Sequence, residues 1–116
     1  MAFAQDRGRA GESLAAAYFE CRGIALLARN TKLAGVEVDL LISEGPVQAI
    51  VEVRLRSRAD FGGAISTLDA RKRERLRRAA LALHQQGAAH PRVDLLTIDL
   101  TAEGARIEHL RNVVTS

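Results

Sequence analysis

The chain has 116 residues, of which 47% are hydrophobic, and its formal charge at neutral pH is +3. This length predicts a single domain over residues 1–116, and the hydrophobic content excludes a disordered protein. Only 3% of the residues are aromatic, which argues against a surface that stacks bases. The single cysteine, Cys21, excludes an internal disulfide and a cysteine-based zinc site. No apolar run approaches the ~18 residues of a membrane span, so we expect a soluble cytoplasmic protein without a membrane partner.

Hydrophobic periodicity predicts a first helix over residues 8–22, followed by a strand over residues 24–29 and a polar loop over residues 30–35. Two candidate stripes lie at helical spacing on this helix. Leu14, Ala17, Tyr18 and Cys21 form one, and Glu12, Ala15, Ala16 and Phe19 form the other. We expect Cys21 to be buried. A second strand over residues 37–43 places Val38, Leu40 and Ile42 on one face.

The rest of the chain continues as an α/β pattern. Residues 47–56 form a third strand, and the Gly45-Pro46 turn before it predicts an antiparallel hairpin with the second. A loop over residues 58–67 leads to the strongest helix, over residues 69–86, which Gly87 ends. Strands over residues 93–100 and 106–110 follow. This order predicts an α/β fold in which helices flank both sides of a mixed sheet.

Positive charge is concentrated between residues 54 and 78, where nine basic residues and three acids give +6, so the rest of the chain carries −3. Such a basic stretch indicates an anionic partner at one face, although a solvated helix surface would give the same pattern. The candidate phosphate contacts are Arg56, Arg71, Lys72, Arg75 and Arg78. No base-reading motif is present, so we expect contacts that position a nucleic acid with little sequence selectivity.

Two acids, Asp39 and Glu52, lie inside otherwise apolar strands, where a carboxylate is costly unless it is paired or bound to a metal. If the hairpin pairs even with odd residue numbers, Asp39 faces Glu52 across the ladder, with Arg54 two residues further on the Glu52 face. Carboxylate oxygens suit Mg²⁺ or Mn²⁺, and such an ion can activate water beside a phosphodiester. The alternative is a structural salt bridge between these acids and nearby arginines.

The motifs match a known family in order along nearly the whole chain, from about residue 8 to residue 113. They are Gly11-Glu12, Gly23-Ile24, Arg29-Asn30, Gly35 with Glu37-Val38-Asp39-Leu40, Val51-Glu52-Val53, Arg56, Phe61-Gly62, Lys72 and Arg75-Leu76. Together they resemble the bacterial YraN family, a group of small proteins with a restriction-endonuclease-like, Holliday-junction-resolvase-like fold. The resemblance implies that fold and an active-site pattern of helix Glu, strand Asp and Glu-x-Lys. This pattern maps to Glu12, Asp39 and Glu52-Val53-Arg54, with the three acids as metal ligands.

The chain departs from the family pattern at Arg54, where the pattern has lysine. Arginine stays charged in proteins and cannot act as a base, but it can clamp a phosphate. Lys72 could substitute for the missing lysine, or it could be a plain phosphate contact or a solvated side chain.

Three hypotheses follow. The first is a Mg²⁺- or Mn²⁺-dependent nuclease that acts on DNA rather than RNA, for which a two-fold homodimer would suit cleavage of two strands. The second is a catalytically impaired nucleic-acid-binding module. The third is an interaction protein without nucleic acid.

Overall fold

The computed structural model describes residues 2–56 and 68–114, with side chains from residue 8 onward. Its elements in chain order are α1 (Ala2–Cys21), β1 (Ala25–Leu33), β2 (Val36–Glu44), β3 (Val47–Arg56), α2 (Ala70–Gln85), β4 (Arg92–Thr101) and β5 (Gly104–Leu110). Every predicted helix and strand is present. Most bounds agree within about three residues, but α1 begins at Ala2 rather than at residue 8, and β1 ends at Leu33 rather than at residue 29. The predicted loop over residues 58–67 lies outside the described residues.

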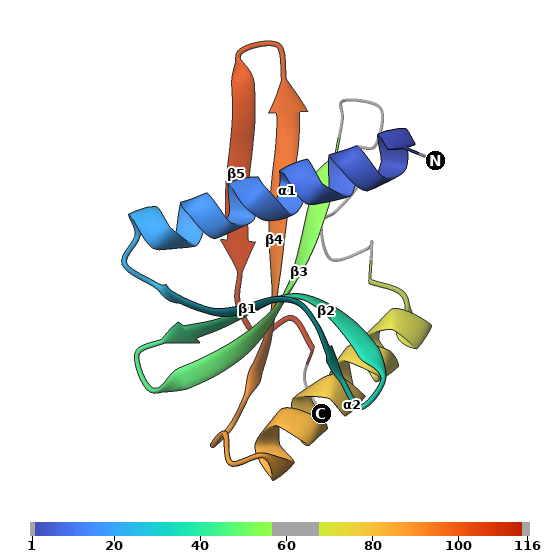
Figure 1. The fold of residues 1–116 in the computed structure, drawn as a ribbon, viewed down its shortest axis with the longest axis vertical. Coiled ribbons are helices and arrows are strands. Elements are labelled where there is room, and N and C mark those ends of the chain that lie inside the picture. Colours follow the sequence, from blue (N-terminus) through green and yellow to red (C-terminus); the bar gives the residue numbers. More distant parts are fainter. Residues whose placement is uncertain (1, 57–67, 115–116) are drawn as a thin grey trace.

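One five-stranded sheet in the order β1-β2-β3-β4-β5 forms the centre of the molecule (Figure 1). Neighbouring strands pair antiparallel except β3 and β4, which are parallel and are separated in the chain by α2. The predicted α/β class with a mixed sheet is confirmed, and this architecture is compatible with a restriction-endonuclease-like fold. No helix in the described part of the chain is long and apolar enough to cross a membrane.

The two helices pack on opposite faces of the sheet. The core under α1 contains Ala15 and Phe19 of the helix, together with inward side chains of β2, β3 and β4. The core under α2 contains Leu76, Ala79 and Leu83, which recur at helical spacing. Asp69 caps α2, since its carboxylate accepts a hydrogen bond from the Lys72 N–H at 2.8 Å.

Of the two candidate stripes on α1, the one with Ala15, Ala16 and Phe19 is buried. Leu14 is 42% exposed and Cys21 is also exposed, so the expected burial of Cys21 is wrong. Gly11 begins the buried side of this helix over β3, where a Cβ at that position would be in ordinary contact with the Leu55 Cβ at 3.5 Å. The same stripe carries Glu12 to the sheet.

The predicted loop over residues 30–35 is also wrong, because β1 continues to Leu33 and only Ala34 and Gly35 form the turn. Both turn residues have positive φ, 51° and 76°, as a two-residue hairpin turn of type I′ requires. The strand continues because Leu33 is buried against α2, together with Val36.

The structure also corrects the predicted single face of the second strand. Val38 joins the core under α2, whereas Leu40 and Ile42 join the core under α1. The pairing of β2 with β3 runs from Glu44↔Val47 to Leu40↔Val51 and stops there. The residues of β2 that precede Leu40 pair with β1 alone, and this half of the strand bends toward α2. The sheet therefore opens between β2 and β3 at the level of Asp39.

Candidate active site

Glu52 and Arg54 both lie on the side of β3 that faces α2, while Val51 and Val53 contact the core under α1. This alternation is the predicted one. Glu52 is only 3% exposed, in the middle of a strand that is paired with β4 through Glu52↔Leu95. The carboxylate is therefore held inside the protein, where it needs charged or hydrogen-bonding partners.

Asp39 occupies the point at which β2 leaves β3. Its Oδ2 accepts a hydrogen bond from the Val53 N–H at 2.8 Å, so the side chain takes a bond that the strand backbone no longer supplies. The predicted even-with-odd register of the hairpin is confirmed by Leu40↔Val51, but the ladder ends one residue before Asp39 and Glu52 would pair. The two carboxylates are nonetheless close enough for Asp39 to raise the pKa of Glu52.

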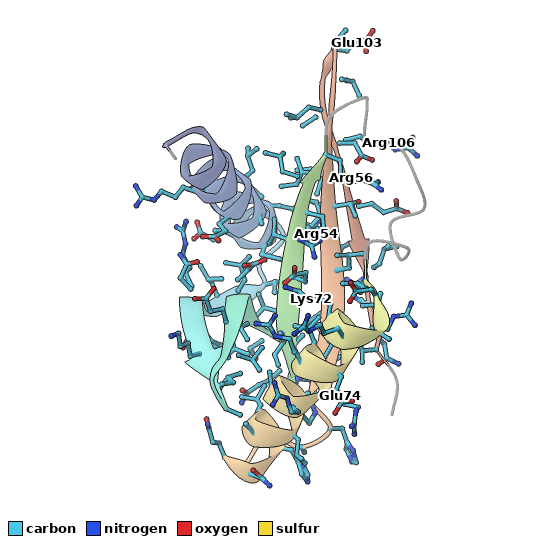
Figure 2. All side chains as sticks on the ribbon, turned by 90° about the vertical axis from the view of Figure 1, so that its right-hand side faces the viewer. Arg54, Arg56, Lys72, Glu74, Glu103 and Arg106 are labelled. Carbon is cyan, nitrogen blue, oxygen red and sulfur yellow. The ribbon has the colours of Figure 1, made fainter. Side chains whose placement is uncertain are left out.

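Lys72 reaches the same place from the first turn of α2. It lies in line with Leu76, Ala79 and Leu83, the buried stripe of that helix, so its side chain points toward the sheet. Lys72 Nζ lies 3.1 Å from Glu52 Oε2, and Arg54 Nη2 lies 3.0 Å from the same oxygen. Figure 2 shows Arg54 and Lys72 adjacent over β3, between the two helices.

These side chains line one hollow of about 420 Å³, which also receives Glu12 and Gly11 from α1. Because the sheet is open here, residues from the α1 side and from the α2 side reach the same space. The four predicted catalytic residues, Glu12, Asp39, Glu52 and Arg54, are thereby brought together with Lys72.

The electrostatics of the hollow are those of a buried carboxylate held by two cations. Burial, and secondarily the Asp39 carboxylate, raise the pKa of Glu52 above its ordinary value, while Arg54 and Lys72 oppose this rise. The Arg54 Nε is buried and makes no hydrogen bond within the described residues. A buried guanidinium nitrogen without a hydrogen-bond partner is uncommon.

The donor set fits a hard divalent ion in chemistry, since three carboxylates line the hollow. Their present arrangement does not form a completed metal site: among the described residues, no three His, Cys, Asp or Glu side chains converge to hold an ion. Glu52 Oε2 is taken by Arg54 and Lys72, and Asp39 Oδ2 by the Val53 N–H. A metal ion at Glu52 Oε2 would therefore compete with these two cations for that oxygen.

The predicted phosphate contacts separate into three sets, of which Lys72 in the hollow is one. Arg71, Arg75 and Arg78 are exposed on one side of α2, and no other described residue pairs with them; we call them the basic stripe. Arg56 is buried instead, and it donates to both oxygens of Asp99 at 2.7 and 3.0 Å. This bidentate pair fastens β3 to β4, so the structure gives Arg56 a role in packing.

A second polar cluster lies away from the hollow, around the fully buried Asp94 of β4. Its carboxylate accepts hydrogen bonds from Arg92, from His109 at 2.7 Å and from the Asn112 N–H. Arg92 also binds Glu44, which ties the β2–β3 turn to β4. Burial alone would raise the pKa of Asp94, but these hydrogen bonds outweigh it and hold the pKa below its ordinary value. The sequence analysis did not predict this cluster, although an acid inside the run Val93-Asp94-Leu95 is a signal of it.

Comparison with known proteins matches residues 11–98 to a family described as uncharacterised protein family UPF0102. A UPF0102 protein of Halorhodospira halophila is 41% identical over 95 residues, which cover 82% of this chain and 78% of the relative. A relative from Stutzerimonas stutzeri is 34% identical over an alignment of 120 positions, which covers the full length of both chains. One of Xanthomonas campestris is 44% identical over 90 residues, 75% of this chain and 74% of the relative. The chain therefore belongs to the UPF0102 family, which is the YraN family that its motifs resemble.

Proposed function

We propose that this protein is a divalent-metal-dependent nuclease that binds DNA and hydrolyses a phosphodiester at the hollow between β2 and β3. The observation that carries the proposal is the convergence of Glu12, Asp39 and Glu52 with two cations at one opening of the sheet. Carboxylates and cations gathered in one hollow are what hydrolysis of an anionic ester by water requires.

Each group has a task in this reaction. The basic stripe attracts the DNA backbone and positions it without reading sequence. Arg54 binds a phosphoryl oxygen through its guanidinium, since its side chain is 34% exposed at the hollow. Glu12, Asp39 and Glu52 supply oxygen ligands, and a bound Mg²⁺ or Mn²⁺ would lower the pKa of water and polarise the phosphoryl oxygen. Lys72 of α2 places a second positive charge beside Glu52.

A second candidate function, DNA binding without cleavage, is favoured by one specific observation. Arg54 stands where the Glu-x-Lys pattern has lysine, and in this structure it neutralises Glu52. An arginine keeps its proton and cannot act as a base, so phosphate binding would survive while hydrolysis is slow or lost.

The deciding experiment is cleavage of labelled duplex, single-stranded and four-way-junction DNA with Mg²⁺ or Mn²⁺. Parent, Glu52→Gln and Arg54→Lys proteins are compared, and circular dichroism checks that each is folded. Metal-dependent product from the parent that disappears with Glu52→Gln supports the nuclease. Product only from Arg54→Lys identifies a binding module disabled at one position. No product from any of the three rejects the nuclease proposal for these substrates.

Binding is measured in parallel, because it separates a DNA-binding module from a protein without a nucleic-acid partner. Fluorescence anisotropy of the same duplex is recorded at several salt concentrations. Phosphate contacts predict an affinity that falls steeply as salt rises. An affinity that is undetectable at low salt would contradict both candidate functions.

A further inference from the structure

Two cations from different elements share one oxygen atom at the centre of the hollow. Arg54 of β3 and Lys72 of α2 both contact Glu52 Oε2, at 3.0 and 3.1 Å. The Glu52 side chain is 4% exposed, whereas those of Arg54 and Lys72 are 34% and 29% exposed. The acid is thus fixed inside the protein, and both cations extend toward the solvent that a substrate would displace.

We propose that Arg54 and Lys72 form a latch that keeps Glu52 from binding a divalent ion in the free protein. A DNA phosphodiester opens the latch by drawing the two cations to its own oxygens, so that metal binding depends on bound DNA. This inference rests on the proposed nuclease function and adds its regulation.

The charges of the hollow support this order of events. With all groups ionised, Glu12, Asp39 and Glu52 carry −3 and the latch carries +2, which leaves −1. A divalent ion alone would leave +1, and a phosphodiester alone would leave −2. The two ligands together bring the hollow to neutrality, and buried charge is least costly when it is balanced.

The geometry supports the same conclusion. A divalent ion at Glu52 Oε2 would sit beside two positive groups that already lie about 3 Å from that oxygen. Repulsion between like charges at this separation is strong inside a protein. The guanidinium of Arg54 is partly exposed and has further N–H donors for a second acceptor, and the four-carbon stem of Lys72 can turn its ammonium toward a phosphate.

Coupling of this kind must be reciprocal: if DNA strengthens metal binding, the metal strengthens DNA binding by the same factor. The latch therefore predicts two linked effects. Parent protein binds Mn²⁺ weakly by itself, and removing one latch cation raises that affinity without DNA.

The test is Mn²⁺ binding to the full chain, followed by the electron paramagnetic resonance signal of free Mn²⁺. Parent, Lys72→Met and Lys72→Gln proteins are titrated without DNA, with Lys32→Met as the matched control. Lys32 is the only other lysine, it is exposed on β1, and it does not line the hollow. Methionine at position 72 continues the buried stripe of α2, so we expect that variant to fold.

We expect both Lys72 variants to bind Mn²⁺ at least tenfold more tightly than the parent, and Lys32→Met to stay within twofold of it. Adding a duplex oligonucleotide should strengthen Mn²⁺ binding of the parent much more than that of Lys72→Met. The Glu52→Gln protein with the same duplex measures the Mn²⁺ that DNA itself binds.

Two results would overturn the inference, and they differ in what they leave standing. Tight Mn²⁺ binding by the parent without DNA, unchanged in the Lys72 variants, rejects the latch but leaves the proposed nuclease intact. No binding above the Glu52→Gln background in any protein, with or without duplex, rejects the latch and the metal-dependent function together.

Discussion

The cluster around Asp94 gives the sharpest test of what stabilises this fold. Asp94 is fully buried, and its carboxylate accepts four hydrogen bonds: two from Arg92, one from His109 and one from the Asn112 N–H. Asp94→Ala would leave the Arg92 charge and two further donors without this acceptor. Removing one partner from a buried charged pair costs about 3–5 kcal/mol.

The isosteric variant separates charge from shape. In Asp94→Asn, the remaining oxygen can still accept from Arg92 Nε and from the Asn112 N–H, but the NH₂ that replaces the other oxygen cannot accept from His109 or from Arg92 Nη2. Neutral hydrogen bonds contribute less than charge-assisted ones, so we expect a loss of about 2 kcal/mol. A domain of this size loses roughly 4 °C of melting temperature per kcal/mol. Asp94→Asn should therefore melt about 8 °C below the parent, and Asp94→Ala about 12–20 °C below it.

The assay is urea unfolding followed by circular dichroism, with the melting temperature as a second measure. Glu44→Gln is the matched control, because Glu44 belongs to the same network but its side chain is 27% exposed. We expect that control to lose about 1 kcal/mol or less. If Asp94→Ala lost under 1 kcal/mol, or no more than Glu44→Gln, the buried network would not be the source of stability that we infer.

Three further predictions concern acid stability, the core and DNA binding. Hydrogen bonds from Arg111 and Arg92 lower the pKa of Glu44 from 4.5 to about 2. The stability that the ionised Glu44 adds to the folded state is therefore complete above pH 4.5 and is lost as the pH falls toward 2. The free energy of unfolding of the parent should therefore drop more between pH 5 and 3 than that of Glu44→Gln. Leu76→Ala leaves a cavity at a fully buried position and should lower the free energy of unfolding in urea by about 2–5 kcal/mol. Leu81→Ala, at a side chain that is 53% exposed, should lower it by under about 1 kcal/mol. Replacing the basic stripe by glutamines should make the negative slope of log affinity against log salt shallower by about 0.9 per lost phosphate contact.

Each of these has a result that would contradict it. Parallel pH profiles for parent and Glu44→Gln would show that the arginines do not hold that carboxylate ionised in solution. Equal losses for the two leucine variants would contradict the burial difference between them. An unchanged salt slope in the glutamine variant would place the DNA contact elsewhere on the surface.

Much of the candidate site could be predicted from the sequence, because costly residues are visible where they interrupt a pattern. Asp39 and Glu52 stood out as acids in apolar strands, and strand alternation placed Glu52 and Arg54 on one face. Glu12 had no such signal of its own, and it entered through the family resemblance. The Lys72 contact was left open, since a lysine in a basic helix resembles any solvated lysine until the helix is oriented on the sheet.

The sequence by itself determined the local structure: the order of helices and strands, the register parity of the β2–β3 hairpin and the alternation along β3. These follow from hydrophobic periodicity and turn chemistry, which act between residues close in the chain. Tertiary packing decided which stripe of α1 is buried, and it decided that β2 leaves β3 at Asp39. The reason is that both outcomes depend on surfaces distant in sequence: Ala15 and Phe19 pack α1 on the sheet, and Val38 packs in the core under α2 while β2 parts from β3. The opening that gathers three acids and two cations is a product of that packing.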